Sequence, residues 1–91
     1  MKKIIVTLKD GSKREITEEE VLLYKLTGEY LWIAWLKNGK LHRKDGPAEE
    51  YVDGSKVWYK NGKLHREDGP AVECADGSKA WWRDGKFIKS E

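Results

Sequence analysis

The sequence predicts an α+β protein that is mainly β. We expect an antiparallel meander of about 23-residue double-hairpin repeats, with an N-terminal hairpin and one capping helix. Three observations predict this class. Tryptophan recurs at equal intervals, at positions 35, 58 and 81. Asn-Gly and Asp-Gly pairs separate short stretches rich in aromatic and aliphatic residues, as in hairpins. One stretch, residues 17–28, instead begins and ends like a helix.

The 91 residues predict a single domain, with residues 1–30 as a cap and residues 31–91 as a β-repeat sheet. Cys74 is the only cysteine and cannot form an intramolecular disulfide, which suits a reducing compartment. The apolar run "IIVTL" is too short for a secretory signal, and no stretch has the length of a membrane span. We therefore expect a cytoplasmic protein without membrane contact.

The N-terminal third differs from the rest of the chain. "KKIIVTLKDGSKREI" predicts a hairpin that turns at Asp10–Gly11. "TEEEVLLYKLTG" predicts a helix, with Thr17 as N-cap, Glu20 completing a capping box, and Gly28 as the stop. The residues expected to lie against the sheet are Val21, Leu22, Tyr24, Lys25 and Leu26.

The repeat follows from aligning residues 35–57 with residues 58–80, where 17 of 23 positions are identical. A third copy begins at Trp81 and covers only the first hairpin. In each copy "NG" or "DG" makes the first turn, "DGP" links the two hairpins, and "DGS" makes the second turn. The predicted strands are Leu31–Lys37, Lys40–Arg43, Ala48–Val52, Lys56–Lys60, Lys63–Arg66, Ala71–Ala75, Lys79–Arg83 and Lys86–Lys89.

The two-residue loops predict which side chains share a face of the sheet. One face is apolar and is expected to lie under the helix: Leu36, Leu41, Ala48, Val52, Val57, Tyr59, Leu64, Ala71, Ala75, Ala80, Trp82 and Phe87. The other is expected to be a surface of aromatic and basic residues that binds a partner: Trp35, Lys37, Lys40, His42, Tyr51, Trp58, Lys60, Lys63, His65, Trp81, Arg83 and Lys86. The alternative for the tryptophans is that they stack on one another as the spine of a thin sheet.

The pattern "WYKNGKLHREDGPA" resembles the variant MORN-type repeats, in the tryptophan-rich version of phage, giant-virus and bacterial hypothetical proteins. The resemblance covers residues 35–91. It implies a twisted single-layer sheet that serves as an interaction scaffold, and it carries no assigned activity. Ile88 and Cys74 depart from the pattern, since histidine and tyrosine stand at those places in the earlier copies.

The repeated histidines and aspartates raise the question of a reactive site. His42 and His65 precede Asp45 and Asp68 by three residues, but general acid–base chemistry would also need a nucleophile or a substrate pocket. The recurring Ser55 and Ser78 lie in turns, and Cys74 occurs in only one copy. Two histidines are also too few for a structural zinc site. We therefore predict no enzyme activity, no cofactor and no metal. The residues predicted to make turns are Asn38, Gly39, Asp45, Gly46, Pro47, Asn61, Gly62, Asp68, Gly69 and Pro70.

The predicted function is a non-enzymatic protein-binding module whose partner has an acidic surface. The resemblance adds a narrower hypothesis: a small phage- or mobile-element-encoded inhibitor of a host protein, of the anti-defence or anti-CRISPR type, acting in the host cytoplasm. Nucleic acid or another anionic surface is an alternative, which the net charge of +2 and the acidic Glu49, Glu50 and Glu73 weigh against. Self-assembly, for example as a homodimer through the C-terminal strand edge, is the third hypothesis.

Overall fold

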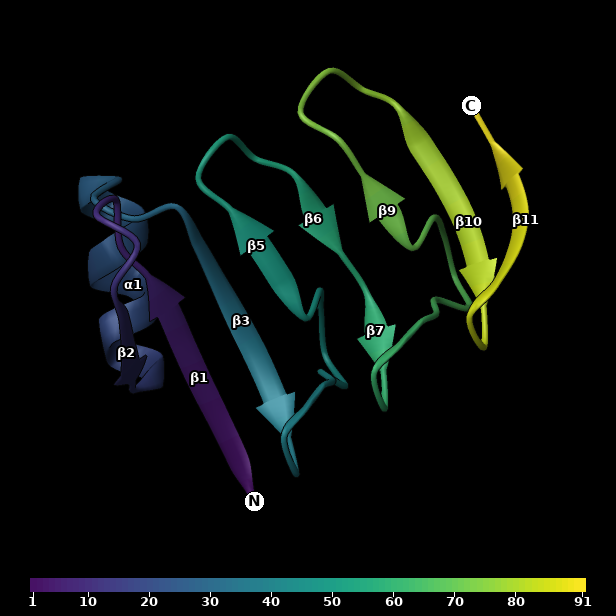
Figure 1. Ribbon diagram of the computed structural model, residues 1–91. Helices are drawn as coiled ribbons and strands as arrows, with labels where there is room; N and C mark the ends of the chain where they lie inside the picture. Colours follow the sequence, from purple (N-terminus) through teal and green to yellow (C-terminus); the bar gives the residue numbers. More distant parts are fainter.

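The computed structural model describes the whole chain, residues 1–91, as eleven short strands and one helix (Figure 1). The helix is α1 (Glu18–Thr27). The strands are β1 (Lys2–Thr7), β2 (Lys13–Ile16), β3 (Trp32–Lys37), β4 (Lys40–Leu41), β5 (Glu49–Tyr51), β6 (Lys56–Val57), β7 (Tyr59–Lys60), β8 (Lys63–Leu64), β9 (Val72–Glu73), β10 (Lys79–Arg83) and β11 (Lys86–Ser90).

The strands form one extended layer in which all pairs are antiparallel. The order in the main sheet is β11-β10-β9-β6-β5-β3-β1-β2, with β4 pairing beside β3, while β7 and β8 form a separate two-stranded hairpin. The prediction of a mainly β antiparallel meander with one helix is confirmed. From β3 onward the chain follows the order of the sequence, whereas β1 lies between β2 and β3, so α1 carries the chain across β1 (Figure 1).

Helix α1 begins and ends at the predicted residues. The Thr17 hydroxyl accepts the Glu20 N–H, and the Glu20 carboxylate accepts the Thr17 N–H, so the capping box is present. Gly28 ends the helix at a φ of 72°, in the left-handed region that glycine adopts without strain. The predicted contact face is only partly right. Val21 is buried, but Leu22 and Leu26 point to solvent, with 70% and 84% of their surfaces exposed.

The hydrophobic core lies between α1 and the first strands. It consists of Val6, Ile16, Val21, Tyr30, Ile33 and Trp35. Ile33 and Trp35 alternate with Ala34 and Leu36 along β3, and side chains alternate between the two faces of a strand. The helix therefore covers the Trp35 face of the sheet.

This placement corrects the predicted assignment of the faces. We expected the apolar face that contains Leu36, Leu41 and Leu64 to lie under α1, but α1 lies on the opposite face (Figure 1). The short stretches after the corners are also one residue out of the predicted register. Tyr51 lies opposite Trp32 on the Leu36 face, and Ala48 is buried on the Trp35 face. A shift of one residue moves every side chain of a strand to the other face.

The hairpin turns have the predicted backbone geometry. Both central residues have positive φ at Asn38–Gly39, Asn61–Gly62 and Asp84–Gly85, as type I′ turns require. Two of the strands after these turns are shorter than predicted, whereas β11 continues one residue further, to Ser90. Lys40–Leu41 and Lys63–Leu64 end two residues early, because Arg43 and Arg66, which follow, enter the corners. The chain contains no helix with the length and apolar character needed to cross a membrane.

Candidate functional site

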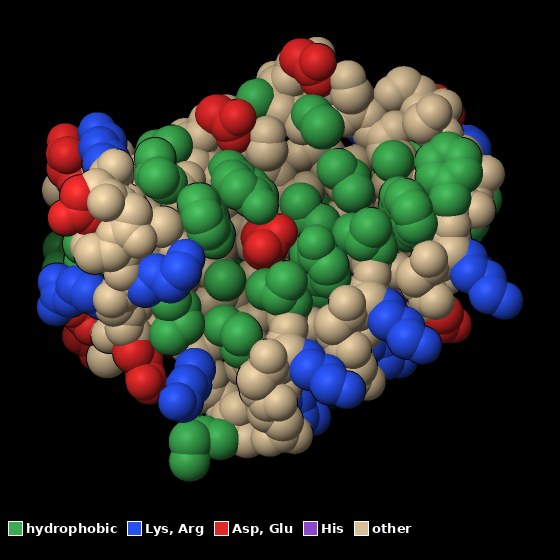
Figure 2. Space-filling view, in the orientation of Figure 1, with side chains coloured by type: hydrophobic (Ala, Val, Ile, Leu, Met, Phe, Trp, Pro, Cys, Tyr) green, Lys and Arg blue, Asp and Glu red, His purple; other side chains and the backbone are tan.

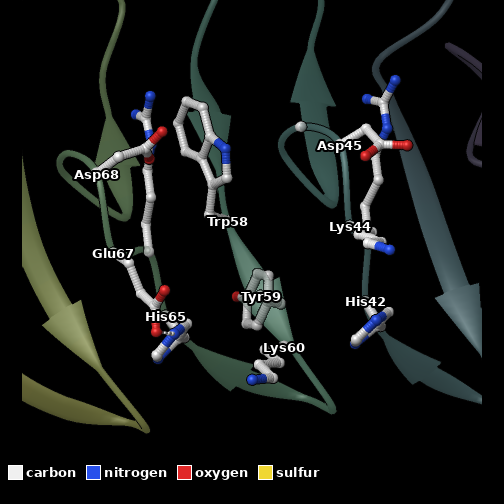
Figure 3. Close-up of a pocket in the computed structure, with 12 residues that line it drawn as sticks. His42, Lys44, Asp45, Trp58, Tyr59, Lys60, His65, Glu67 and Asp68 are labelled. Atoms are coloured by element: carbon white, nitrogen blue, oxygen red, sulfur yellow. Dashed lines mark hydrogen bonds and ion pairs between the residues drawn. The ribbon is translucent and has the colours of Figure 1, made fainter.

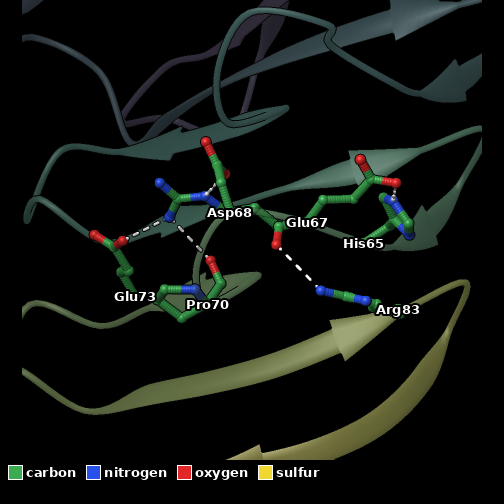
Figure 4. Close-up of polar contacts among 7 residues, drawn as sticks. His65, Glu67, Asp68, Pro70, Glu73 and Arg83 are labelled. Carbon is green, nitrogen blue, oxygen red and sulfur yellow. Dashed lines mark hydrogen bonds and ion pairs between the residues drawn. The ribbon is translucent and has the colours of Figure 1, made fainter.

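Each "DGP" corner is held by an arginine that reaches back across it. The Arg66 guanidinium donates to the Pro70 carbonyl at 3.0 Å, to Glu73 at 2.8 Å and to Asp68 at 3.1 Å (Figure 4). It also lies 3.8 Å from the centre of the Trp58 ring. A guanidinium can stack on an indole while its edge donates to carboxylates, so one side chain fixes the strand, the corner and the following strand together.

The first corner has the same arrangement, except that Arg43 makes no contact with Asp45 corresponding to the one between Arg66 and Asp68. Arg43 lies 3.9 Å from the Trp35 ring centre and donates to the Pro47 carbonyl at 3.1 Å and to Glu50 at 2.7 Å. Here Glu50 is buried, and its second oxygen pairs with Lys25 of α1. The corner is therefore also the anchor of the helix.

The glycines of the two corners make room for these arginines. A Cβ atom at Gly69 would lie 3.0 Å from the Arg66 guanidinium carbon, and at Gly46 the corresponding distance to Arg43 is 3.3 Å. Neither glycine needs positive φ, so it is the close approach of the side chain that favours glycine. The predicted turn residues Asp45, Gly46, Pro47, Asp68, Gly69 and Pro70 all lie in these two corners.

The two histidines connect neighbouring units. His42 Nδ1 accepts the backbone N–H of Asn61 at 3.0 Å, and His65 Nδ1 accepts that of Asp84 at the same distance. At these points no strand ladder joins one hairpin to the next, so an imidazole takes the place of a carbonyl acceptor. Burial, with Lys37 next in weight, lowers the pKa of His42, which favours the neutral form that the bond needs.

A groove runs between the two corners, with a volume of about 880 Å³ (Figure 3). Trp58 and Tyr59 are its two hydrophobic residues, and charged and histidine side chains make up most of the rest. Neither imidazole is hydrogen-bonded to a serine, threonine or cysteine side chain. No three His, Cys, Asp or Glu side chains gather as ligands of a metal ion would. The groove is thus organised by the arginine and histidine contacts.

The predicted partner surface is not one exposed face. Trp35 is 6% exposed and belongs to the core, so it is not available to a partner. Trp58 and Trp81 are half-buried, and each is covered by a cation, Arg66 and Lys89 respectively. The three indoles are therefore covered by cationic side chains rather than stacked on one another.

The predicted basic residues line the hairpin tips. The Lys40 stem lies beside Gly62, where an added Cβ atom would meet it at 3.7 Å, and the Lys63 stem lies in the same way beside Gly85. Successive tips thus stack, and their ammonium groups form a row. The lysine row comprises Lys37, Lys40, Lys60, Lys63, Arg83 and Lys86.

The face opposite α1 carries a large apolar surface that no other element covers (Figure 2). We call it the open face. It comprises Ile5, Trp32, Ala34, Leu36, Leu41, Tyr51, Val57, Tyr59, Leu64, Val72, Ala80, Trp82 and Phe87. Trp32 packs on Tyr51 with ring centres 5.9 Å apart, and Trp82 packs edge-on against Phe87 at 5.4 Å. Phe87 is 56% exposed.

The sequence interpretation grouped many of these side chains correctly but placed them in the core. It omitted Trp32 altogether, although alternation along the predicted strand from Leu31 puts it on the Leu36 face. It also missed the roles of Arg43 and Arg66. An arginine follows the tryptophan by eight residues in both copies, and this repetition was the available signal.

Comparison with family models, with curated proteins and with solved structures finds no match for this chain.

Proposed function

We propose that the protein is a non-enzymatic binding module that uses the open face to hold another protein. The observation that carries this proposal is a single-layer sheet whose open face, opposite the helix, is largely apolar and carries no second layer (Figure 2). A sheet that is apolar on one face normally buries that face against another element. Large exposed apolar surfaces on a small protein mark sites of interaction.

The composition of the open face supports a protein partner. Two tryptophans and two tyrosines lie on it, and these residue types contribute most of the binding energy in protein interfaces. The sheet beneath is held by the corner arginines and the histidine links, so the aromatic side chains stand on a fixed framework. A fixed framework lowers the entropic cost of binding.

The finer features of the sequence prediction fit within this proposal. Double-hairpin repeats of the variant MORN type would explain why the two corners share their contacts. The resemblance also supports the narrower proposal of a phage-encoded inhibitor of a host protein that acts in the cytoplasm.

The test compares two variants that differ only in the face that they change. Leu64→Lys places a charge on the open face, and Leu26→Lys places one on the exposed side of α1. Both variants should keep the wild-type circular dichroism spectrum. We expect a protein captured from bacterial lysate by the wild type to be retained by Leu26→Lys and lost by Leu64→Lys. Equal capture by all three proteins would contradict the proposal.

The lysine row favours a second candidate function, the binding of an anionic surface such as nucleic acid. The stacked tips hold several cations along one edge of the sheet. Binding of this kind releases counterions and weakens steeply with salt. If this candidate is right, fluorescently labelled single-stranded or duplex oligonucleotides should bind the wild type at low salt. A Lys40→Glu, Lys63→Glu double variant should then bind them no longer.

A further inference from the structure

One ionisable side chain lies in the middle of the open face. The strand registers place a row of facing residues across the sheet, in the order Ile5, Ala34, Glu49, Val57, Val72 and Ala80. Glu49 is the one charged residue of this row and is half-buried. In Figure 2 an acidic side chain lies among the apolar ones near the centre of this face.

The second unit has an apolar residue at the position that corresponds to Glu49. Val72 occupies the same place relative to Trp58 as Glu49 does relative to Trp35. Two residues later, Tyr51 of the first unit likewise corresponds to Cys74 of the second. The two differences make one contact, because the Tyr51 hydroxyl donates to the Glu49 carboxylate at 3.1 Å. The first unit thus has a carboxylate–phenol pair where the second has valine and cysteine.

Glu49 differs from the other glutamates of the corners in having no cationic partner. Glu50 pairs with Arg43 and Lys25, and Glu73 pairs with Arg66, whereas the Tyr51 hydroxyl is the one side-chain donor to Glu49. Burial raises the pKa of Tyr51 to about 12, and the nearby Glu49 charge adds to the effect. The pKa of Tyr59 is raised by burial and then by the same carboxylate, so two neutral phenols flank Glu49.

A partner that covers the open face removes the remaining water from Glu49. Burying an ionised carboxylate without a counter-charge is strongly unfavourable, and a well-placed cation offsets this cost. The cations of the open face itself, Lys3 and Lys13, lie at its β1–β2 edge, with Lys13 over the Trp32 ring. A second copy of this chain, docked by the same face about a two-fold axis near Glu49, would therefore bring another Glu49 to that point rather than a cation. A basic side chain of a different protein meets the need, and an arginine could also stack on a flanking tyrosine ring.

We infer that the open face binds a short apolar segment of another protein that carries one arginine or lysine, whose cation pairs with Glu49 between Tyr51 and Tyr59. The apolar residues of the segment cover the aromatic side chains on either side, and the single cation sets its register. This inference rests on the proposed function and specifies the chemistry of the partner.

The test is a selection from a phage-displayed library of random linear 12-residue peptides. The baits are the full-length wild type, Glu49→Val, which installs the residue of the second unit, and Leu64→Lys. We expect the wild type to select aromatic and aliphatic peptides that contain one arginine or lysine. Glu49→Val should still select apolar peptides, without the preference for a basic residue, and Leu64→Lys should select few of either.

One selected peptide then gives a quantitative test by fluorescence polarisation. Replacing its basic residue by leucine should weaken binding to the wild type at least tenfold. The same replacement should change binding to Glu49→Gln less than threefold, because the charge that the cation meets is gone.

Several results would overturn the inference. Apolar peptides selected without a basic residue, or the same basic preference on Glu49→Val, would leave the proposed function standing and remove the role of Glu49. If the wild type selects no peptides that Leu64→Lys fails to select, the proposed function is contradicted as well. A wild-type dimer in analytical ultracentrifugation that Leu64→Lys dissociates would make a second copy the occupant. Dimerisation of Glu49→Val, without basic selection by the wild type, would show that Glu49 only keeps copies apart.

Discussion

The two corners of the sheet are built from the same residues but differ in what covers them. At the first, α1 covers Trp35, and Glu50 is buried between Arg43 and Lys25. At the second, Trp58 is half-buried, and the Glu73 side chain is 34% exposed with Arg66 as its partner. Two contacts of the arginine are nevertheless alike. The guanidinium nitrogen lies 3.1 Å from the proline carbonyl oxygen in the first corner and 3.0 Å in the second, and 2.7 Å and 2.8 Å from the glutamate carboxylate.

This difference shows that the corner does not need the helix in order to form. Its contacts join residues eight or fewer positions apart, so they are local and recur wherever the sequence recurs. The helix adds burial to one copy and makes that copy the core of the protein. The same residue types should therefore contribute unequally to stability in the two units.

The largest expected effect tests this inequality at the tryptophans. Trp35→Ala removes a buried core side chain and should lower the free energy of unfolding by about 4 kcal/mol, whereas Trp58→Ala should cost about half as much. Urea unfolding monitored by circular dichroism measures both. If Trp35→Ala does not fold, Trp35→Phe and Trp58→Phe make the milder pair. Equal losses would mean that α1 does not stabilise the first unit.

The next effect concerns the arginines. Arg43→Ala leaves the buried Glu50 with Lys25 as its one cation and should cost about 2–3 kcal/mol. Arg66→Ala exposes Glu73 to water and should cost about 1 kcal/mol. Unfolding of the two variants in urea gives the comparison directly. A larger loss of unfolding free energy for Arg66→Ala would mean that the arginine contributes more to stability in the second unit, which α1 does not cover.

A smaller effect should appear as a dependence of stability on pH. Since the folded state lowers the pKa of His42 from 6.5, the unfolded chain binds the proton more tightly. The contribution of His42 is therefore complete above pH 6.5 and is lost as the pH falls through the folded pKa. His42→Asn keeps an acceptor for the Asn61 N–H and should flatten this part of the urea midpoint profile between pH 7 and pH 5. The stability that the wild type loses through His42 over this pH range should stay below about 1 kcal/mol, the usual net value of one hydrogen bond. An unchanged profile would show that the proton does not compete with the Asn61 contact.

The smallest effect belongs to the outer side of the helix. Leu26→Lys should change the free energy of unfolding by less than about 0.5 kcal/mol, because Leu26 is 84% exposed and the two residues have similar helix propensities. Val21→Ala, in the core, should cost about 2 kcal/mol. A marked loss for Leu26→Lys would indicate that the outer leucines are covered in solution.

The candidate site could be predicted from the sequence only in part. Tyr59, Trp82 and Phe87 of the open face were grouped together, since alternation within a hairpin is local, whereas Trp32 was omitted and Tyr51 was placed on the other face. That this face lies away from α1 could not be predicted, because both faces carry enough apolar residues to accept a helix. Glu49 was interpreted only as an acidic interruption of a basic pattern, since its neighbours across the sheet are set by a register that the corners decide.

The sequence by itself determined the features that depend on a few neighbouring residues. These are the capping box at Thr17, the stop at Gly28, the positive-φ turns and the recurring corners, where each residue type meets a requirement of its own backbone. Only the tertiary structure decided which face α1 covers, which register follows each corner, and where Glu49 lies. Those outcomes depend on how much surface each arrangement buries across the whole sheet. A shift of one residue exchanges the two faces without changing any local preference.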